Sequence, residues 1–395
     1  MSEIPLAELI VRIAARGEGV TETGRHAAFA VPGDALADDG SVAPGPHHQV
    51  PPCRHFPECG GCQLQHVDDQ AFRAYLASRI EGALAQHRLT TEIRAAHLSP
   101  PNSRRRASLR ALKLGQKAVI GFNSERSHQI VDMRECHVLR PELFALIAPL
   151  RALLSSAMRP RRTGEVALAL TDQGVDVNFK GVDAADLVAV ERLTEFCTEQ
   201  KLARMSLDQG LGPETFYEPE PVTVTLSGKA VPLPMGAFLQ ATEDGEAALI
   251  DAVREAVGEA RRSADLFAGL GTFALALPGQ VYAAEASRDS VLALKRVAPA
   301  TAVEHRDLYR RPLDAAELAG FDAVVLDPPR AGAADQVANL AASSVPRIAY
   351  VSCNPATFAR DAKTLAEGGY TLDWVRPVGQ FRWSTHVELA AAFRR

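Results

Sequence analysis

The last part of the chain alternates short apolar segments with helical segments, and this alternation constrains the fold more than any other feature. The apolar segments occupy residues 263–269, 281–287, 321–329 and 347–355. Short buried strands that alternate with helices are typical of a parallel α/β sheet. Residues 371–378 and 386–393 resemble two further strands, joined as a hairpin that finishes the sheet. We therefore expect an α/β, Rossmann-like domain over residues 236–395.

The preceding residues divide into two parts, because 395 residues are too many for one ordinary domain. Residues 1–50 hold short strand-like, turn-rich segments and predict a small β module. Residues 51–235 combine short strands with helical stretches, which predicts a central mixed α+β domain. Within that domain, residues 71–87 carry apolar side chains at helical spacing, namely Phe72, Leu76, Ile80 and Leu84. A helix with one buried face is expected there.

Composition and charge limit where the protein works and what it binds. No apolar run reaches the roughly 20 residues that span a bilayer, and Met1 does not lead into a secretory signal. We therefore expect a cytoplasmic protein. The net charge of −5 argues against binding nucleic acid through bulk electrostatics. One stretch is basic, however: Arg104, Arg105, Arg106, Arg110, Lys113, Lys117, Arg126, Arg134, Arg140, Arg159, Arg161 and Arg162. It is either a local phosphate-binding surface or a solvated face with scattered ion pairs.

A glycine turn after the first predicted strand indicates a nucleoside cofactor. Gly269 and Gly271 follow the strand that contains Asp265 and precede a predicted apolar helix. Glycine lets the backbone approach a ligand closely at such a turn. Glu285 ends the next predicted strand, where a carboxylate can accept hydrogen bonds from both ribose hydroxyls. A dinucleotide is the competing ligand, but Ala274 stands where the third glycine of that pattern would be.

The segment from Asp327 to Arg330, Asp-Pro-Pro-Arg, favours a methyltransferase. It ends the fourth predicted strand. Prolines there stiffen the chain beside the sulfur of the cofactor, and a carboxylate can meet the polar edge of a target base. The alternative is an ordinary turn at the end of a strand.

Cys353 ends the fifth predicted strand and faces the crevice where open α/β sheets bind ligands. Carbon 5 of a pyrimidine accepts a methyl group only after a thiolate has added to carbon 6, and a base must then remove the carbon-5 proton. Glu388 is the best candidate for that base, because a poorly solvated carboxylate is a stronger base. His386 is the rival candidate. The alternative for Cys353 is a small buried core residue.

Three of the six cysteines, Cys53, Cys59 and Cys62, are clustered, and Cys136 is an available fourth. In a cytosolic chain such a cluster favours metal ligands over disulfides. Four cysteines can hold zinc or an iron–sulfur cluster, although the spacing is not the paired pattern typical of zinc. Cys197 is expected in the core.

Together these motifs resemble the RNA 5-methyluridine (uracil-C5) methyltransferases, and most closely the iron–sulfur branch that modifies 23S ribosomal RNA in bacteria. The resemblance extends over nearly the whole chain, through PCRHFPECGGCQLQH, SRRRASLR, IVDMRECHVLRP, MGAFLQAT, DLFAGLGTFAL, LDPPRAG, YVSCNPATFARD and THVE. It implies a C-terminal class I methyltransferase domain that uses S-adenosylmethionine to modify RNA. It also implies that the helix near residues 70–90 packs against that domain.

The resemblance implies roles for single residues as well. Cys353 would be the nucleophile and Glu388 the base, and a 4Fe-4S cluster would be bound by Cys53, Cys59, Cys62 and Cys136. S-adenosylmethionine would be bound by Gln240, Phe267, Gly269, Gly271, Thr272, Glu285, Asp307 and Asp327.

Two departures from the family pattern concern the cofactor turn and the N-terminus. Ala268 and Thr272 stand where cysteine and asparagine are usual, and the N-terminal RNA-binding β-barrel is shortened, which leaves more of the RNA binding to Arg104 to Arg106. Three alternatives stay open at this point. The substrate is transfer RNA, the methylated base is adenine or cytosine, or the chain is an iron–sulfur RNA-binding protein without catalysis.

Overall fold

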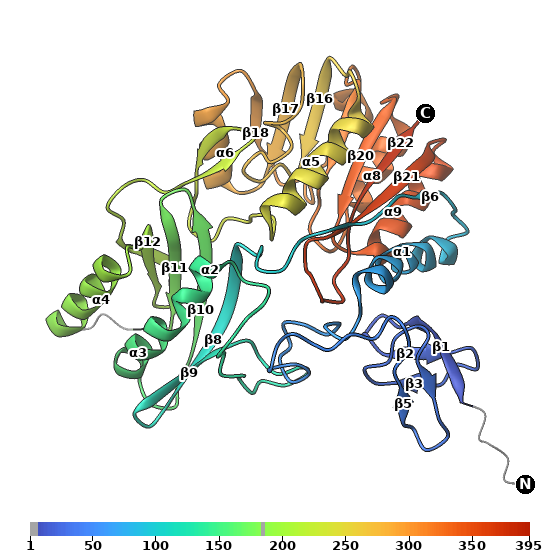
Figure 1. Cartoon of the computed structure of the whole chain (residues 1–395). Coiled ribbons are helices and arrows are strands. Elements are labelled where there is room, and N and C mark those ends of the chain that lie inside the picture. Colours follow the sequence, from blue (N-terminus) through green and yellow to red (C-terminus); the bar gives the residue numbers. More distant parts are fainter. Residues whose placement is uncertain (1–6, 183–185) are drawn as a thin grey trace, which may run out of the picture.

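The computed structural model describes residues 7–182 and 186–395, and Figure 1 shows three regions that follow one another along the chain. The first six residues of the predicted N-terminal module lie outside the described residues. A five-stranded sheet, a six-stranded sheet with a separate two-stranded hairpin, and a nine-stranded sheet form the framework. Within the described ranges, no helix combines the length and apolar character needed to cross a membrane.

The N-terminal sheet has the strand order β3-β2-β1-β4-β5. Its strands are short: β1 (Glu8–Ile13), β2 (Gly19–Thr21), β3 (His26–Ala27), β4 (Ala35–Leu36) and β5 (Val42–Ala43). Its small core consists of Ile10, Ala27, Ala30 and Leu36. Asp34 is buried and accepts hydrogen bonds from the backbone N–H groups of Val31 and Gly45, which fixes the turn after β3.

Helix α1 (Asp69–Gln86) begins at Asp68, whose side chain accepts a hydrogen bond from the N–H of Ala71. Phe72, Leu76, Ile80 and Leu84 are buried on one face, as their spacing predicts. They share a core with residues of the C-terminal sheet and of the helices that cover it. The chain then adds β6 (Glu92–Ile93) and β7 (His97–Leu98) to the same sheet, next to β21. Residues 69–98 therefore pack with the C-terminal region although they precede the central one.

The central sheet has the order β13-β12-β11-β10-β8-β9. Its elements are β8 (Arg106–Leu114), β9 (Lys117–Gly121), α2 (Pro141–Ala145), α3 (Ile147–Ala157), β10 (Thr163–Thr171), β11 (Gly174–Lys180), α4 (Leu187–Glu199), β12 (Arg204–Asp208) and β13 (Pro213–Tyr217), followed by the hairpin of β14 (Thr223–Leu226) and β15 (Lys229–Pro232). Cys197 is fully buried in its core, as expected.

The C-terminal sheet is parallel from β18 to β20, continues through antiparallel β22 to β21, and ends with the short strands β6 and β7 beside β21. Its elements are α5 (Glu243–Val257), β16 (Arg262–Leu266), β17 (Gln280–Glu285), α6 (Arg288–Val297), β18 (Ala302–His305), α7 (Ala315–Leu318), β19 (Ala323–Leu326), α8 (Ala334–Ala342), β20 (Arg347–Ser352), α9 (Pro355–Glu367), β21 (Thr371–Gly379) and β22 (Glu388–Arg394). The predicted strands and the final hairpin are confirmed.

Both faces of this sheet are covered. Val324 packs into the core formed with α1, α8 and α9, whereas its neighbour Val325 packs into the core formed with α5. The strand order runs β18-β17-β16 in one direction from β16 and β19-β20 in the other. Open α/β sheets bind ligands beyond the carboxyl ends of the strands at such a reversal.

The segment after the glycine turn corrects one prediction, because residues 269–276 form successive turns and no helix. The N–H of Ala274 donates to the carboxylate of Asp265 at 2.7 Å. Within this described segment, helical bonds run only from Leu275 to Gly271 and from Leu277 to Phe273. Pro278 follows at once and has no N–H with which to extend a helix.

Candidate active site

A cavity of about 630 Å³ opens beyond the carboxyl ends of the parallel strands. It is lined by almost every predicted site residue of this region: Gln240, Phe267, Gly269, Thr272, Glu285, Asp307, Asp327, Cys353, His386 and Glu388. Gly271 is set behind this lining, and a Cβ atom there would lie 2.5 Å from a methyl group of Leu294. The structure thus brings the glycine turn and the predicted catalytic residues to one site.

Glu285 is held in place by the glycine turn. One carboxylate oxygen accepts the N–H of Gly269 at 2.8 Å, and the other accepts the N–H of Ser287 at 2.7 Å. Both bonds come from backbone groups, so the carboxylate has one position at the edge of the cavity. A fixed acceptor there suits the paired hydroxyls of a ribose.

Phe267 forms an aromatic wall of the cavity together with Tyr309. Its backbone has a φ of 67°, in the left-handed region that non-glycine residues rarely adopt. The N–H groups of Phe267 and Ala268 both donate to the carbonyl of Ala284, at 3.0 and 3.1 Å, which holds this conformation. The ring centroids of Phe267 and Tyr309 are 5.5 Å apart. Strained backbone of this kind is concentrated at functional sites.

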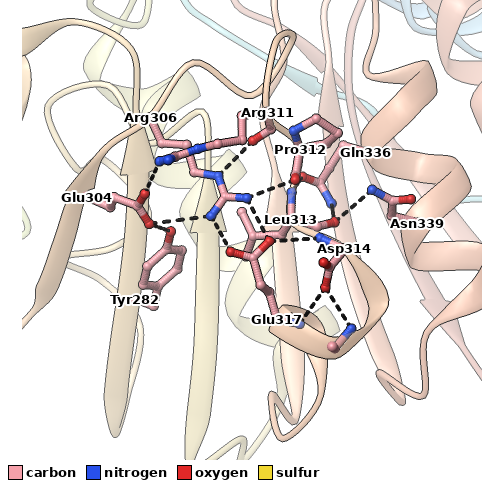
Figure 2. Close-up of polar contacts among 11 residues, drawn as sticks. Tyr282, Glu304, Arg306, Arg311, Pro312, Leu313, Asp314, Glu317, Gln336 and Asn339 are labelled. Atoms are coloured by element: carbon pink, nitrogen blue, oxygen red, sulfur yellow. Dashed lines mark hydrogen bonds and ion pairs between the residues drawn. The ribbon is translucent and has the colours of Figure 1, made fainter.

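The loop that carries Asp307 is fixed by its buried neighbour Arg306, as Figure 2 shows. The Arg306 guanidinium donates to both carboxylate oxygens of Glu317, at 2.6 and 2.7 Å, and to the carbonyls of Arg311 and Pro312. Pairing with Glu317 raises the pKa of Arg306. The side chain of Gln336 extends the network by bonding to the backbone of Leu313. This network positions one wall of the cavity.

We expect Arg306→Met to weaken S-adenosylmethionine binding about tenfold and to lower the free energy of unfolding by roughly 1–3 kcal/mol. The variant leaves Glu317 and two backbone carbonyls without their donor. Isothermal titration of the cofactor and thermal denaturation measure the two effects. Arg311→Met is the matched control, because it removes an exposed cation from the same loop. Wild-type affinity in the Arg306 variant would contradict the positioning role.

Cys353 and Glu388 meet at the end of two neighbouring strands. The antiparallel register of β20 and β22 pairs Ser352 with Leu389, so the next positions outward are Cys353 and Glu388. Asp327 follows β19, the other neighbour of β20, and lines the same cavity. The three side chains predicted to act on the pyrimidine therefore surround one point.

Burial dominates the electrostatics of this group. It raises the pKa of Glu388 to about 8, with a further contribution from the charge of Asp327 and an opposing one from Arg106. Burial also raises the pKa of Asp327 to about 7. The pKa of the Cys353 thiol rises to about 11 through burial and the negative charges of Glu388 and Asp327, while Arg330 lowers it. The resting cysteine is therefore a thiol, and a neighbouring carboxyl group can take up its proton only when that group is ionised.

His386, the rival base, lies in the same cavity with its ring 5.5 Å from that of Phe381. Burial lowers its pKa, and the charges of Arg330 and Arg104 lower it further. The imidazole is therefore neutral near pH 7 and a weaker base than Glu388.

The three successive arginines 104–106 are not an exposed basic surface. Arg105 is 4% exposed and forms an ion pair with Glu246 at 2.6 Å. Arg104 lies over the rings of Phe122 and Phe381, at 5.7 and 5.3 Å. Arg106 does line the cavity, where it covers the ring of Phe238 at 4.7 Å.

Several other cations of the basic stretch form ion pairs with neighbouring carboxylates. Arg110 pairs with Glu165, Arg134 with Asp132, and Arg140 with Glu142. This part of the stretch agrees with the scattered-ion-pair alternative.

Residues that sequence reasoning missed include Phe238, Tyr309 and Phe381, which line the cavity. They are aromatic residues on connecting segments, and only the tertiary fold brings them to the glycine turn. Arg106, predicted as part of the RNA-binding arginines, lines the same cavity from the start of β8.

The cysteines Cys53, Cys59, Cys62 and Cys136 line a second cavity, next to the central sheet. A Cβ atom on Gly60 would lie 2.8 Å from the carbonyl of Asn123, so the cysteine loop needs glycine to approach the sheet this closely. Burial raises the pKa of all four thiols, to about 12 at Cys62. Within the part of the chain that the structure describes, no group of three or more His, Cys, Asp or Glu side chains is arranged to hold a metal ion.

Comparison with known proteins identifies the family of the chain. The family model described as tRNA (Uracil-5-)-methyltransferase matches residues 300–395. An uncharacterized RNA methyltransferase of Zymomonas mobilis is 51% identical, over 98% of this chain and 99% of the relative. The 23S rRNA (uracil(1939)-C(5))-methyltransferase of Erwinia tasmaniensis is 30% identical, over 90% of this chain and 84% of the relative. The chain belongs to the RNA uracil-5-methyltransferase family.

The fold of this uracil-5-methyltransferase is confirmed independently. The crystal structure of the Pyrococcus abyssi tRNA (uracil-54, C5)-methyltransferase in complex with S-adenosyl-L-homocysteine has a TM-score of 0.77 to this chain. It is 22% identical, and the match covers 98% of this chain and 99% of that one. The predicted α/β class with a Rossmann-like methyltransferase domain is therefore correct. The enzyme depends on S-adenosylmethionine and acts on RNA.

Proposed function

We propose that this enzyme methylates carbon 5 of one uridine in 23S ribosomal RNA through a covalent bond between Cys353 and carbon 6. The observation that carries the mechanism is the meeting of Cys353, Asp327 and Glu388 at the end of three neighbouring strands in one cavity. The relative that is 30% identical and named for 23S ribosomal RNA supports the substrate. Glu388 is buried, whereas Cys353 and Asp327 are half-buried and face the cavity, where a base can reach them.

The proton and electron movements can be assigned to these side chains. The Cys353 thiol gives its proton to the ionised Glu388, which releases it to solvent, and the Cys353 sulfur forms a bond to carbon 6. The electron pair of the carbon 5–carbon 6 double bond then makes carbon 5 nucleophilic. Carbon 5 takes the methyl group that S-adenosylmethionine supplies, the methyl–sulfur bond breaks, and S-adenosylhomocysteine leaves. Glu388 removes the carbon-5 proton. The double bond re-forms, and the bond to the Cys353 sulfur breaks.

The cofactor half of the cavity fits a nucleoside with an amino-acid tail. We assign the ribose hydroxyls to Glu285 and the adenine to the wall formed by Phe267 and Tyr309. Asp307 lies on the loop fixed by Arg306, in reach of the same nucleoside. Gly269 and Thr272 complete this side of the cavity, Gly271 supports the turn from behind its lining, and Gln240 lies where the cofactor side meets Asp327.

We assign a 4Fe-4S cluster to Cys53, Cys59, Cys62 and Cys136. Four cysteines at one cavity are the donor set of such a cluster, and the sulfurs of a cluster are farther apart than those around a single ion. The cluster would tie the loop of residues 53–62 to the connecting segment between β9 and α2, which carries Cys136. Its role is structural, because methyl transfer moves no electron.

The cluster predicts the composition of the protein purified without oxygen. We expect about four iron atoms and four sulfides per chain, with a brown absorption that Cys62→Ala removes along with part of the thermal stability. Cys197→Ala is the control, because that buried sulfur contacts Met205 and does not line the cavity of the four cysteines. One equivalent of zinc in place of iron would show that the site is a zinc site.

RNA binding is assigned to the N-terminal module and the central domain. The module exposes Leu9, Val11 and Phe29, which are 59%, 44% and 44% exposed, with Arg12 and Arg16 also exposed nearby. Apolar side chains next to cations suit the bases and phosphates of an RNA strand.

Mass spectrometry of RNA from a strain that lacks the gene identifies the target. We expect one 5-methyluridine to disappear from 23S ribosomal RNA and to return when the wild-type gene is restored. Loss from transfer RNA instead would replace the ribosomal substrate by the transfer RNA alternative. Full methylation of both RNAs in the deletion strain would refute the proposal.

A further inference from the structure

Two buried glutamines form a chain of hydrogen bonds that ends in the active-site cavity. Gln380 lies between β21 and β22, and Gln240 precedes α5; they are 2% and 3% exposed. The N–H of Ala241 donates to Oε1 of Gln380 at 2.8 Å, and Nε2 of Gln380 donates to Oε1 of Gln240 at 2.8 Å. Nε2 of Gln240 faces Oδ2 of Asp327 at 3.5 Å.

The first donor fixes the donor-to-acceptor direction of every hydrogen bond in this series. A backbone N–H can only donate, so the atom of Gln380 that meets it must be the carbonyl oxygen. The other end of Gln380 is then an NH₂ group, which requires the carbonyl oxygen of Gln240. Gln240 therefore presents its own NH₂ to the cavity. Rotating either amide by half a turn would oppose donor to donor or acceptor to acceptor.

Packing keeps Gln380 in this position. A Cβ atom on Gly245, in the first turn of α5, would lie 2.7 Å from the Cβ of Gln380. The backbone that carries Gln240 is fixed as well, because Arg105 donates from Nε to the carbonyl of Gln240 at 3.1 Å. A donor held by both its backbone and its side chain is preorganised for a ligand.

The pair formed by the Gln240 NH₂ and the Asp327 carboxylate matches one pyrimidine better than another. It offers a donor next to an acceptor, close to Cys353. Uracil presents a carbonyl oxygen next to the N–H at position 3, which is the complementary pattern. Cytosine has a lone pair at position 3 and an amino group at position 4, so like groups would face one another.

We propose that Gln380 is a positioning residue that selects uracil over cytosine by fixing the direction of the Gln240 amide. The proposal rests on the Cys353 mechanism above, since that cysteine places the pyrimidine beside Asp327. Gln380 itself touches neither the base nor the cofactor. It acts only through Gln240.

The test compares binding of two RNAs that differ by one base. Unmodified transcripts of 23S ribosomal RNA and transfer RNA are first incubated with the wild-type enzyme, and the one that accepts a methyl group is remade with cytidine at the target position. Affinities for both RNAs are then measured in the Cys353→Ala background, so that no covalent bond forms. The substrate proposal is thus tested in the wild-type assay and the Gln380 proposal in the variants.

We expect uridine RNA to bind roughly 10- to 100-fold more tightly than cytidine RNA, and Gln380→Met to reduce this ratio about tenfold or more. Gly245→Ala, which displaces Gln380 without changing its chemistry, should reduce the ratio too. Gln173→Met is the matched control, because Gln173 is a half-buried glutamine that also bonds to backbone but lies between β10 and β11, away from the cavity. An unchanged ratio in Gln380→Met, or an equal fall in Gln173→Met, would overturn the proposal. So would a change confined to S-adenosylmethionine affinity.

Discussion

Cys353→Ala is expected to lower methyl transfer roughly 10⁴-fold or more, because carbon 5 of uracil has no other route to nucleophilicity in this site. Incorporation of tritiated methyl groups into unmodified RNA measures the loss. Affinity for S-adenosylmethionine should stay within about twofold of wild type, since the glycine turn and Glu285 are untouched. The variant should therefore bind its cofactor normally and fail in the chemical step.

A covalent trap makes the same point by another route. RNA that carries 5-fluorouridine has no proton on carbon 5 to lose, so the wild-type enzyme should remain attached to it in a denaturing gel. Cys353→Ala should give no such band, whereas Cys197→Ala, which changes a fully buried core sulfur, should give one. Methylation by Cys353→Ala at the wild-type rate would refute the nucleophile assignment.

The sequence was sufficient to predict the C-terminal sheet and most of its site. The motifs around Gly269, Asp327 and Cys353 each follow a strand, and parallel strands bring their carboxyl ends together whatever else the chain does. The order of these motifs along the chain was therefore enough to predict that they lie together in space. The helix predicted after Gly271 was wrong because Pro278 has no N–H with which to continue it, so that only a short segment with two helical hydrogen bonds forms.

Other parts of the site depend on contacts between distant segments. The strands β6 and β7 span two residues each, too short for a sequence pattern, and join the C-terminal sheet only by pairing with β21. Arg105 belongs to a run of arginines that suggested RNA binding, yet its partner Glu246 is remote in sequence. Gln380 carried no motif at all. Its importance follows from the direction of the hydrogen bonds that join Ala241, Gln380 and Gln240, which only the three-dimensional structure reveals.

Glu388→Gln is expected to lower turnover roughly 10²- to 10⁴-fold and to leave the enzyme bonded to methylated RNA. The amide cannot accept the carbon-5 proton, so the reaction stops after methyl transfer and before release of Cys353. Mass spectrometry of the trapped complex should show the chain, the RNA and one added methyl group. His386→Ala is the control, and it should turn over without accumulating the adduct.

The raised pKa of Glu388 predicts that the rate of product release and the stability of the wild-type enzyme change in opposite directions as the pH rises. Glu388 must be ionised to act as the base, so release of methylated RNA should speed up as the pH rises through about 8. The same pKa is raised from 4.5 to about 8 on folding, so the folded state holds an extra proton in that interval. The contribution of Glu388 to the free energy of unfolding is therefore fully present below pH 4.5 and is lost as the pH rises through about 8.

Glu388→Gln separates these two effects, because the neutral amide has no ionisation cost. We expect its melting temperature to exceed that of wild type at pH 9 and the difference to shrink towards pH 5. A stabilised enzyme that cannot release its product would show that burial of Glu388 serves catalysis at the expense of the fold. Accumulation of the adduct in His386→Ala, with normal turnover in Glu388→Gln, would instead make His386 the base.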